Sequence, residues 1–206
     1  MMGRIGVLIS GRGSNLQAII DAIADGRLGA RVAVVVSNRS DAAGLARARA
    51  AGIPTVVIPP KSFASREACD EAIVATLREH QVDLVCLAGY MRLVGEPILS
   101  AYPFGILNIH PSLLPAFPGL DAQAQAIAHG VRVSGATVHL VTAGLDDGPI
   151  VMQAAVPVLD GDTSEVLAAR ILREEHRIYP EAIGLVLSGG WSVQGRRFIR
   201  RAAAGV

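Results

Sequence analysis

Residues 4–20 read RIGVLISGRGSNLQAII, and this stretch decides the fold. Residues 4–9 are mostly apolar, which indicates a buried strand. Residues 10–15 contain two glycines, and the apolar residues after them recur at helical spacing: Leu16, Ile19, Ile20 and Ile23. A strand, a glycine-rich turn and a helix in this order are typical of the first unit of an open α/β sheet.

The same alternation continues through the first half of the chain. Predicted strands at 32–36, 55–58 and 84–87 alternate with predicted helices at 41–51 and about 65–79. After residue 105 the pattern changes, with strands at 105–109, 133–141 and 150–156, helices at about 122–128 and 163–187, and a last strand at 191–200. We predict an α/β fold: a Rossmann-like, mostly parallel sheet with helices on both faces and antiparallel strands in the C-terminal half.

The composition excludes several classes of protein. The chain has 206 residues, of which 51% are hydrophobic, and a net charge of +1. We expect no membrane span, no signal peptide and no nucleic-acid partner. The arginines of residues 196–201 are interpreted as the charged edge of a terminal strand rather than a nucleic-acid arm. Cys69 and Cys86 lack the spacing of a zinc site or a disulfide framework, so we expect no metal and a cytoplasmic location.

The turn after the first strand, Ser10-Gly11-Arg12-Gly13-Ser14-Asn15, favours a bound phosphate. Glycines let the backbone approach a ligand, and a helix N-terminus offers free N–H groups. Leu16 stands where the dinucleotide fingerprint has a third glycine or alanine, so a monophosphate fits better than NAD or ATP. The alternative is that Ser14 only caps the helix, with Gln17 completing a capping box.

A second motif, Asn108-Ile109-His110-Pro111, stands at the end of a predicted strand. Side chains alternate along a strand, so Asn108 and His110 project to one face. An amide beside an imidazole suits holding a carbonyl oxygen while a proton moves nearby. The alternative is a capping Asn and a packed His.

Carboxylates mark two further positions. Asp146 and Asp147 lie in a Gly-Pro turn, where such residues are usually solvated, but one of them could reach His110 and favour its protonation. Glu175 shares the apolar face of a long helix and therefore needs a partner, either a ligand group or a structural arginine. His176 is a candidate for orienting Glu175, and His139 lies either in the core or along a cleft.

Together these motifs resemble the formyltransferase family, in the folate-dependent form that acts on glycinamide ribonucleotide in purine biosynthesis. The resemblance runs from Arg4 to about Ser188 and is carried by residues 9–16, 87–92, 108–115, 145–149 and 175–180. It implies one domain of 1–206, with a phosphate-binding half (1–103), a catalytic and folate-binding half (104–188) and a C-terminal strand and tail (189–206).

The resemblance also implies site residues. Gly13, Ser14 and Asn15 would bind the phosphate of glycinamide ribonucleotide, and Glu175 its ribose. The folate co-substrate, 10-formyltetrahydrofolate, would contact the following residues: Arg66, Met91, Arg92, Leu93, Val94 and Asn108. The implied catalytic residues are Asn108 and His110, which would stabilise an oxyanion, and Asp146, which would assist proton transfer.

Departures from the family and rival functions remain. The family's bacterial members are expected to carry a basic residue near Ala116 and histidines near Asp121 and Gln123, so secondary substrate contacts in this loop would differ from theirs. A formyltetrahydrofolate hydrolase would have an extra N-terminal domain, and a methionyl-tRNA formyltransferase a C-terminal RNA-binding domain. A non-catalytic nucleotide-binding domain would not need Asn108, His110 and Asp146 together. We expect small-molecule substrates and a monomer or homodimer.

Overall fold

The computed structural model describes residues 2–201, and their strands form one sheet with nine members. The order across the sheet is β3-β2-β1-β4-β5-β6-β7-β9-β8. The strands are β1 (Gly3–Ile9), β2 (Ala30–Ser37), β3 (Thr55–Val57), β4 (Leu84–Leu87), β5 (Ile106–His110), β6 (Val133–Leu140), β7 (Ile150–Pro157), β8 (Trp191–Gln194) and β9 (Arg197–Arg200). Strands β1 to β5 are parallel, whereas β6 is antiparallel to both of its neighbours, β5 and β7. The predicted fold class is therefore confirmed.

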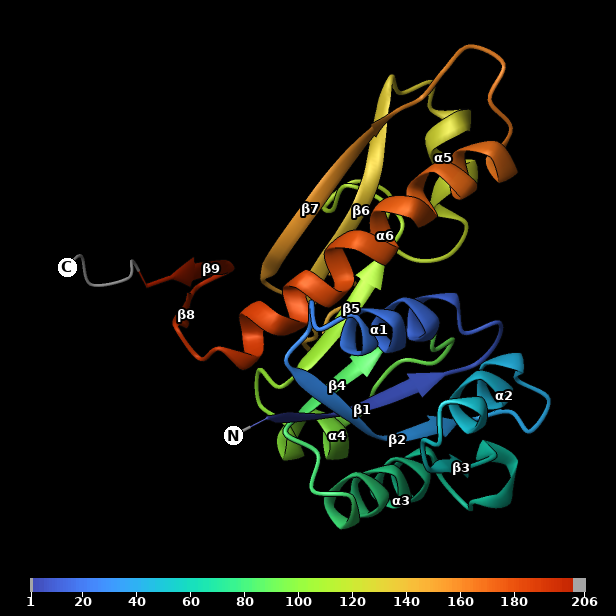
Figure 1. The fold of residues 1–206 in the computed structure, drawn as a ribbon. Coiled ribbons are helices and arrows are strands. Elements are labelled where there is room, and N and C mark those ends of the chain that lie inside the picture. The colour runs from blue at the N-terminus through green and yellow to red at the C-terminus, as the bar shows by residue number, and fades with distance from the viewer. Residues whose placement is uncertain (1, 202–206) are drawn as a thin grey trace.

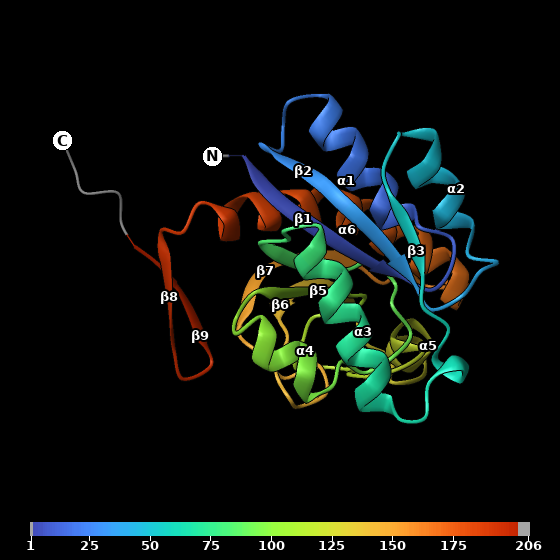
Figure 2. The same ribbon diagram turned by 90° about the horizontal axis from the view of Figure 1, so that it is seen from below.

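Helices cover both faces of the sheet (Figures 1 and 2). One face packs against α1 (Ser14–Ala24), α2 (Ala43–Ala50), α5 (Ala122–Ala128) and α6 (Ser164–Leu187), and the other against α3 (Arg66–Glu79) and α4 (Glu96–Ala101). Strand β1 shows why: Ile5, Val7 and Ile9 join the first apolar core, while Leu8 joins the second. Because side chains alternate along a strand, β1 contributes residues to the apolar core on each face of the sheet.

The parallel strands bring their carboxyl ends together at one edge of this part of the sheet. The turns after β1, β4 and β5 begin there, at Ser10, Ala88 and Pro111. The fully buried Tyr179 of α6 donates from its hydroxyl toward the carbonyl oxygens of Leu87 (2.9 Å) and Leu107 (3.1 Å). This contact fixes α6 beside the ends of β4 and β5, one turn after Glu175.

The structure corrects three local predictions. Residues 191–200 form a hairpin, β8 and β9, because Gly195 adopts a left-handed φ of 59° and reverses the chain. Residues 202–206 of the predicted tail lie outside the described part. Ser14 does not cap α1, since Gly13 is the N-cap with φ 70° and no side chain bonds there, so the capping box is wrong. The short helices α4 and η1 (Pro60–Ser62) were not predicted.

Candidate active site

The turn after β1 is held by backbone contacts. Ser10 N donates to Gly89 O (3.1 Å), and Gly44 N donates to Gly11 O (3.0 Å). Gly13 has a left-handed φ of 70°, and a Cβ there would lie 2.6 Å from the Cα of Gly44. Only glycine fits this position, for both reasons. Because no side chain caps α1, the N–H groups of its first turn are left for an anion.

Glu175 meets this turn from α6. Asn15 donates from Nδ2 to Glu175 Oε2 at 2.7 Å, and both residues are only 8% exposed. Within the described residues the partner of Glu175 is thus an amide, and not the structural arginine considered from the sequence, while its contact with a ligand group stays a prediction. Burial raises the pKa of the Glu175 carboxyl. The hydrogen bond from Asn15 and the charge of Arg12 lower it by less, so the pKa stays above its usual value. Asn15 Oδ1 is buried without a hydrogen-bond partner among residues 2–201, an acceptor that a ligand could satisfy.

His176 does not orient Glu175 by a hydrogen bond within the described residues. Its Nε2 is buried and unpaired, and the ring lines a cavity of about 330 Å³ between α1 and its neighbours, together with Ser14, Gln17, Ala18, Asp21, Arg27 and Arg47. Burial lowers the pKa of His176, against the attraction of Asp21.

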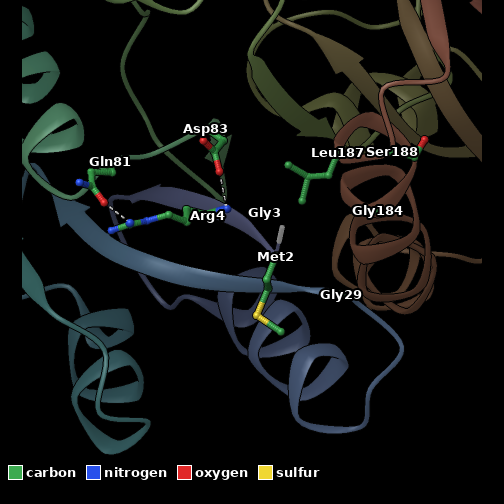
Figure 3. Close-up of a pocket in the computed structure, with 9 residues that line it drawn as sticks. All are labelled: Met2, Gly3, Arg4, Gly29, Gln81, Asp83, Gly184, Leu187 and Ser188. Atoms are coloured by element: carbon green, nitrogen blue, oxygen red, sulfur yellow. Dashed lines mark hydrogen bonds between the residues drawn. The ribbon is translucent and has the colours of Figure 1, made fainter.

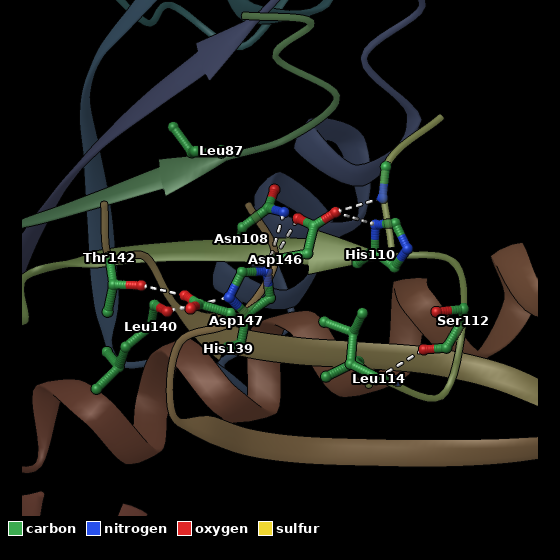
Figure 4. A network of polar contacts seen from close by, with 12 residues as sticks. Leu87, Asn108, His110, Ser112, Leu114, His139, Leu140, Thr142, Asp146 and Asp147 are labelled. Carbon is green, nitrogen blue, oxygen red and sulfur yellow. Dashed lines mark hydrogen bonds and ion pairs between the residues drawn. The ribbon is translucent and has the colours of Figure 1, made fainter. Parts of the chain in front are cut away.

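Asn108 and His110 extend from β5 toward a carboxylate (Figure 4). His110 Nδ1 lies 3.3 Å from Asp146 Oδ2, as the sequence suggested for one of the two aspartates. His110 Nε2 donates to the carbonyl of Phe117 at 2.9 Å. Both ring nitrogens therefore face acceptors, an arrangement that a doubly protonated imidazolium satisfies.

His139 joins this group and was not assigned to it from the sequence. It is paired with Asn108 across β5 and β6, and its Nε2 lies 3.2 Å from Asn108 Nδ2 and 3.6 Å from Asp146 Oδ1. The only sequence signal was its position on the same strand face as Thr137. The antiparallel register that brings it beside Asn108 could not be read from the sequence.

The turn that carries Asp146 folds back over β5 and β6. Asp146 has a left-handed φ of 50°, which is strained for a residue with a Cβ, and it accepts a hydrogen bond from Gly119 N at 2.8 Å. Burial raises the pKa of Asp146, but contacts with His139, Gly119 N–H and His110 outweigh it and hold the pKa below its usual range. The carboxylate is therefore ionised at neutral pH.

The chain matches the model of the formyl transferase family over residues 3–183. The chain belongs to this family. Phosphoribosylglycinamide formyltransferase of Escherichia coli is 46% identical over 198 residues, which are 96% of this chain and 91% of that protein. The crystal structure of glycinamide ribonucleotide transformylase 1 from Symbiobacterium toebii superposes with a TM-score of 0.95 at 62% identity, covering 97% of this chain and 94% of that one.

Two other relatives differ in length from this formyl transferase. The trifunctional purine biosynthetic protein adenosine-3 of Drosophila pseudoobscura is 49% identical over 188 residues, but these residues span 14% of that protein's length. A formyltetrahydrofolate deformylase of Pseudomonas syringae superposes with a TM-score of 0.89 at 27% identity and is covered over 66% of its chain. The fold is therefore shared by transferases and a deformylase.

The predicted folate contacts of this formyl transferase lie in the turn after β4. Met91 and Leu93 are 68% and 60% exposed, whereas Arg92 and Val94 are partly buried. Arg66, at the start of α3, donates from Nη2 to Leu93 O at 2.8 Å. This turn therefore presents apolar side chains to solvent beside the ends of β1 and β5, and Ser10 Oγ accepts from Met91 N at 2.8 Å.

Other features of this formyl transferase lie away from the group around His110. A cavity of about 580 Å³ opens at the amino ends of β1 and β4, the opposite end of the parallel strands (Figure 3). The described residues hold no cluster of His, Cys, Asp or Glu suited to a metal ion. Within residues 2–201, no helix has the length and hydropathy required to cross a bilayer.

Proposed function

We propose that this chain transfers the formyl group of 10-formyltetrahydrofolate to the amine of glycinamide ribonucleotide in purine biosynthesis. The observation that carries the proposal is the placement of His110, Asn108 and an ionised Asp146 at the strand ends, beside the glycine turn of residues 10–15. The names of the relatives from Escherichia coli and Symbiobacterium toebii support the same activity. We further propose that it acts in the cytoplasm as a monomer or homodimer on small molecules alone.

Binding of the ribonucleotide is proposed at the turn after β1. Its phosphate would accept from the N–H groups at the start of α1, at Gly13, Ser14 and Asn15. A ribose hydroxyl would donate to Glu175 or to the unpaired Asn15 Oδ1, both of which are buried beside this turn. The folate would lie along Met91 to Val94 and Asn108, with Arg66 near its glutamate tail.

The chemistry requires no protein nucleophile. The substrate amine attacks the formyl carbon, a new C–N bond forms, and the carbonyl oxygen becomes an oxyanion. Asn108 Nδ2 and His110 Nε2 are the proposed donors to that oxygen, which would replace the Phe117 carbonyl that His110 contacts in the structure. The C–N bond to the folate then breaks, and the amine proton passes to the folate nitrogen with the assistance of Asp146.

The test is formyl transfer from 10-formyltetrahydrofolate, followed as tetrahydrofolate release with and without glycinamide ribonucleotide. Release that depends on the ribonucleotide, with formylated product identified by mass, is the expected result. Equal release without the ribonucleotide would identify a hydrolase, the second candidate that the Pseudomonas syringae deformylase raises. No release in either case would point to a non-catalytic nucleotide-binding domain.

A further inference from the structure

The turn between β4 and α4, residues 88–95, is fixed at three points, although six of its eight residues are wholly or partly open to solvent. Ser10 Oγ accepts from Met91 N, and Arg66 donates to Leu93 O. The third contact comes at the end of the turn, where Gly95 N donates to Asp70 Oδ2 at 2.9 Å. The segment from Met91 to Gly95 is therefore held by contacts to its backbone, while Val94 packs against the second core and the side chains of Met91 and Leu93 stay exposed.

Asp70 is an unusual residue to find in this role. It lies on α3, is 2% exposed and follows the buried Cys69. Burial raises the pKa of the Asp70 carboxyl, against the hydrogen bond from Gly95 N–H and the positive charges of Arg66 and Arg92. No salt bridge to either arginine forms within residues 2–201, so the backbone N–H of Gly95 is the contact that compensates its burial.

The close approach of Gly95 to Asp70 shows that the residues at these two positions depend on each other. Its φ of −93° and ψ of 176° are available to any residue, so backbone conformation does not require a glycine here. A Cβ at this position would instead overlap Asp70 Oδ2, while its next neighbours, Asp70 Cγ at 3.5 Å and Arg66 Nε at 3.6 Å, are at ordinary distances. The absence of a side chain at residue 95 serves the approach of the Asp70 carboxylate.

We propose that Asp70 is a positioning residue that holds the turn of residues 91–95 in the shape that receives the folate co-substrate. The inference rests on the proposed function and deepens it, because Asp70 touches no substrate and acts through the Gly95 N–H. Asp70 would therefore affect the binding of the folate, and neither the transfer step nor the binding of the ribonucleotide.

The experiment is a double-mutant cycle of Asp70→Ala and Gly95→Ala in the full chain. Each single variant is expected to raise KM for 10-formyltetrahydrofolate about tenfold, the size of one lost hydrogen bond to a charged group. The kcat and the KM for glycinamide ribonucleotide should stay within about twofold of the wild type. The double variant should resemble Asp70→Ala alone, because the added Cβ then has no carboxylate to displace.

Two further variants separate positioning from general stability. Asp70→Asn keeps an oxygen that can accept from Gly95 N–H, so its folate KM is expected to stay close to that of the wild type. If Asp70→Ala fails to fold, Gly95→Ala carries the test, and a normal folate KM in that variant overturns the inference. Glu71→Ala removes the neighbouring, exposed carboxylate of α3 and should leave every parameter unchanged. Thermal unfolding of each variant confirms that the folded protein is being compared.

The outcomes distinguish this inference from the proposed function. A wild-type protein without ribonucleotide-dependent transfer overturns the proposed function and this inference with it. An active wild type whose Asp70→Ala variant keeps a normal folate KM overturns the inference alone. A fall in kcat together with a similar rise in both KM values would mean that Asp70 has only a structural role. Additive effects in the double variant would mean the same.

Discussion

Two carboxylates near the ends of the parallel strands, one buried and one partly buried, differ in the direction of their pKa shifts. Glu175 on α6 faces one neutral amide, Asn15, and burial raises its pKa. Asp146 in the turn before β7 faces two imidazoles and a backbone N–H, and its pKa falls despite burial. The partners that the fold places around each group, and not burial alone, decide whether the charge is stabilised.

The contrast suggests a division of work. Asp146 keeps a fixed negative charge beside His110, which suits a site where charge develops during the reaction. Glu175 keeps a carboxyl that is poorly solvated until a ligand supplies a donor, which suits binding. Substitutions that neutralise one or the other carboxylate test whether this division is real.

The largest expected effect follows from breaking the contact between His110 and Asp146. His110→Ala should lower kcat by about 10²–10³, the loss of one oxyanion donor, or about 2.7–4 kcal/mol in the barrier. Asp146→Ala should lower kcat by about 10²–10⁴, because it removes the group that assists proton transfer. Ribonucleotide binding, measured by calorimetry, should stay close to that of the wild type, because Asn15 and Glu175 are untouched. Normal turnover in either variant would remove these residues from the proposed mechanism.

Glu175→Gln should act on binding instead. Loss of a charged acceptor for a ribose hydroxyl is expected to raise KM for glycinamide ribonucleotide by about tenfold or more, with kcat within a few-fold. Steady-state kinetics with the ribonucleotide varied at saturating folate measure this split. A fall in kcat at unchanged KM would contradict the assignment of Glu175 to binding.

Replacing each carboxylate with its amide, Asp146→Asn or Glu175→Gln, should change the stability of the protein in opposite directions. Because the pKa of Asp146 is lowered on folding, its charge stabilises the protein above its unfolded pKa, and Asp146→Asn should destabilise it by about 1–2 kcal/mol at pH 7. Because the pKa of Glu175 is raised on folding, its ionisation opposes folding as pH rises above the ordinary value of 4.5, and Glu175→Gln should stabilise the protein at pH 7.

Urea unfolding at pH 7 and pH 4 measures both stability differences. The gain from Glu175→Gln should vanish near pH 4, where the carboxyl is protonated in both states. Destabilisation by both variants at pH 7 would mean that the two carboxylates do not differ in the way proposed.

The smallest expected effect concerns His139. It contacts Asn108 and Asp146 but is not a proposed donor to substrate, so His139→Ala should lower kcat by about tenfold, equivalent to about 1.4 kcal/mol. His139→Gln, which retains a polar side chain near Asn108, should lose less. A loss as large as that of His110→Ala would place His139 in the chemistry itself.

The sequence was sufficient for the elements whose patterns are local. Strands β1 and β4 and helices α3, α5 and α6 lie within two residues of their predicted bounds, because apolar periodicity and turn residues signal them directly. The closeness of Asp146 to His110 was only one option for a turn that is usually solvated. It depends on a left-handed residue and on the Gly119 N–H, neither of which has a sequence signature.

The sequence did not specify which distant segments meet. The partner of Glu175 is 160 residues away, and the pairing of His139 with Asn108 depends on strand register. The need for a glycine at position 95 likewise comes from a carboxylate 25 residues earlier in the chain. The assigned roles of all these residues stay predictions until the variants are measured.

The two ends of the sheet have a bearing on how the protein behaves at high concentration. An exposed edge strand offers unpaired backbone groups to another molecule and so favours aggregation. Here the edges are β3, which has three residues, and β8, which has four, too short to template much pairing. Arg197 and Arg200 lie on β9, the strand paired with β8, so two copies approaching this edge would bring like charges together. The sheet thus ends in segments that discourage growth from one molecule into the next.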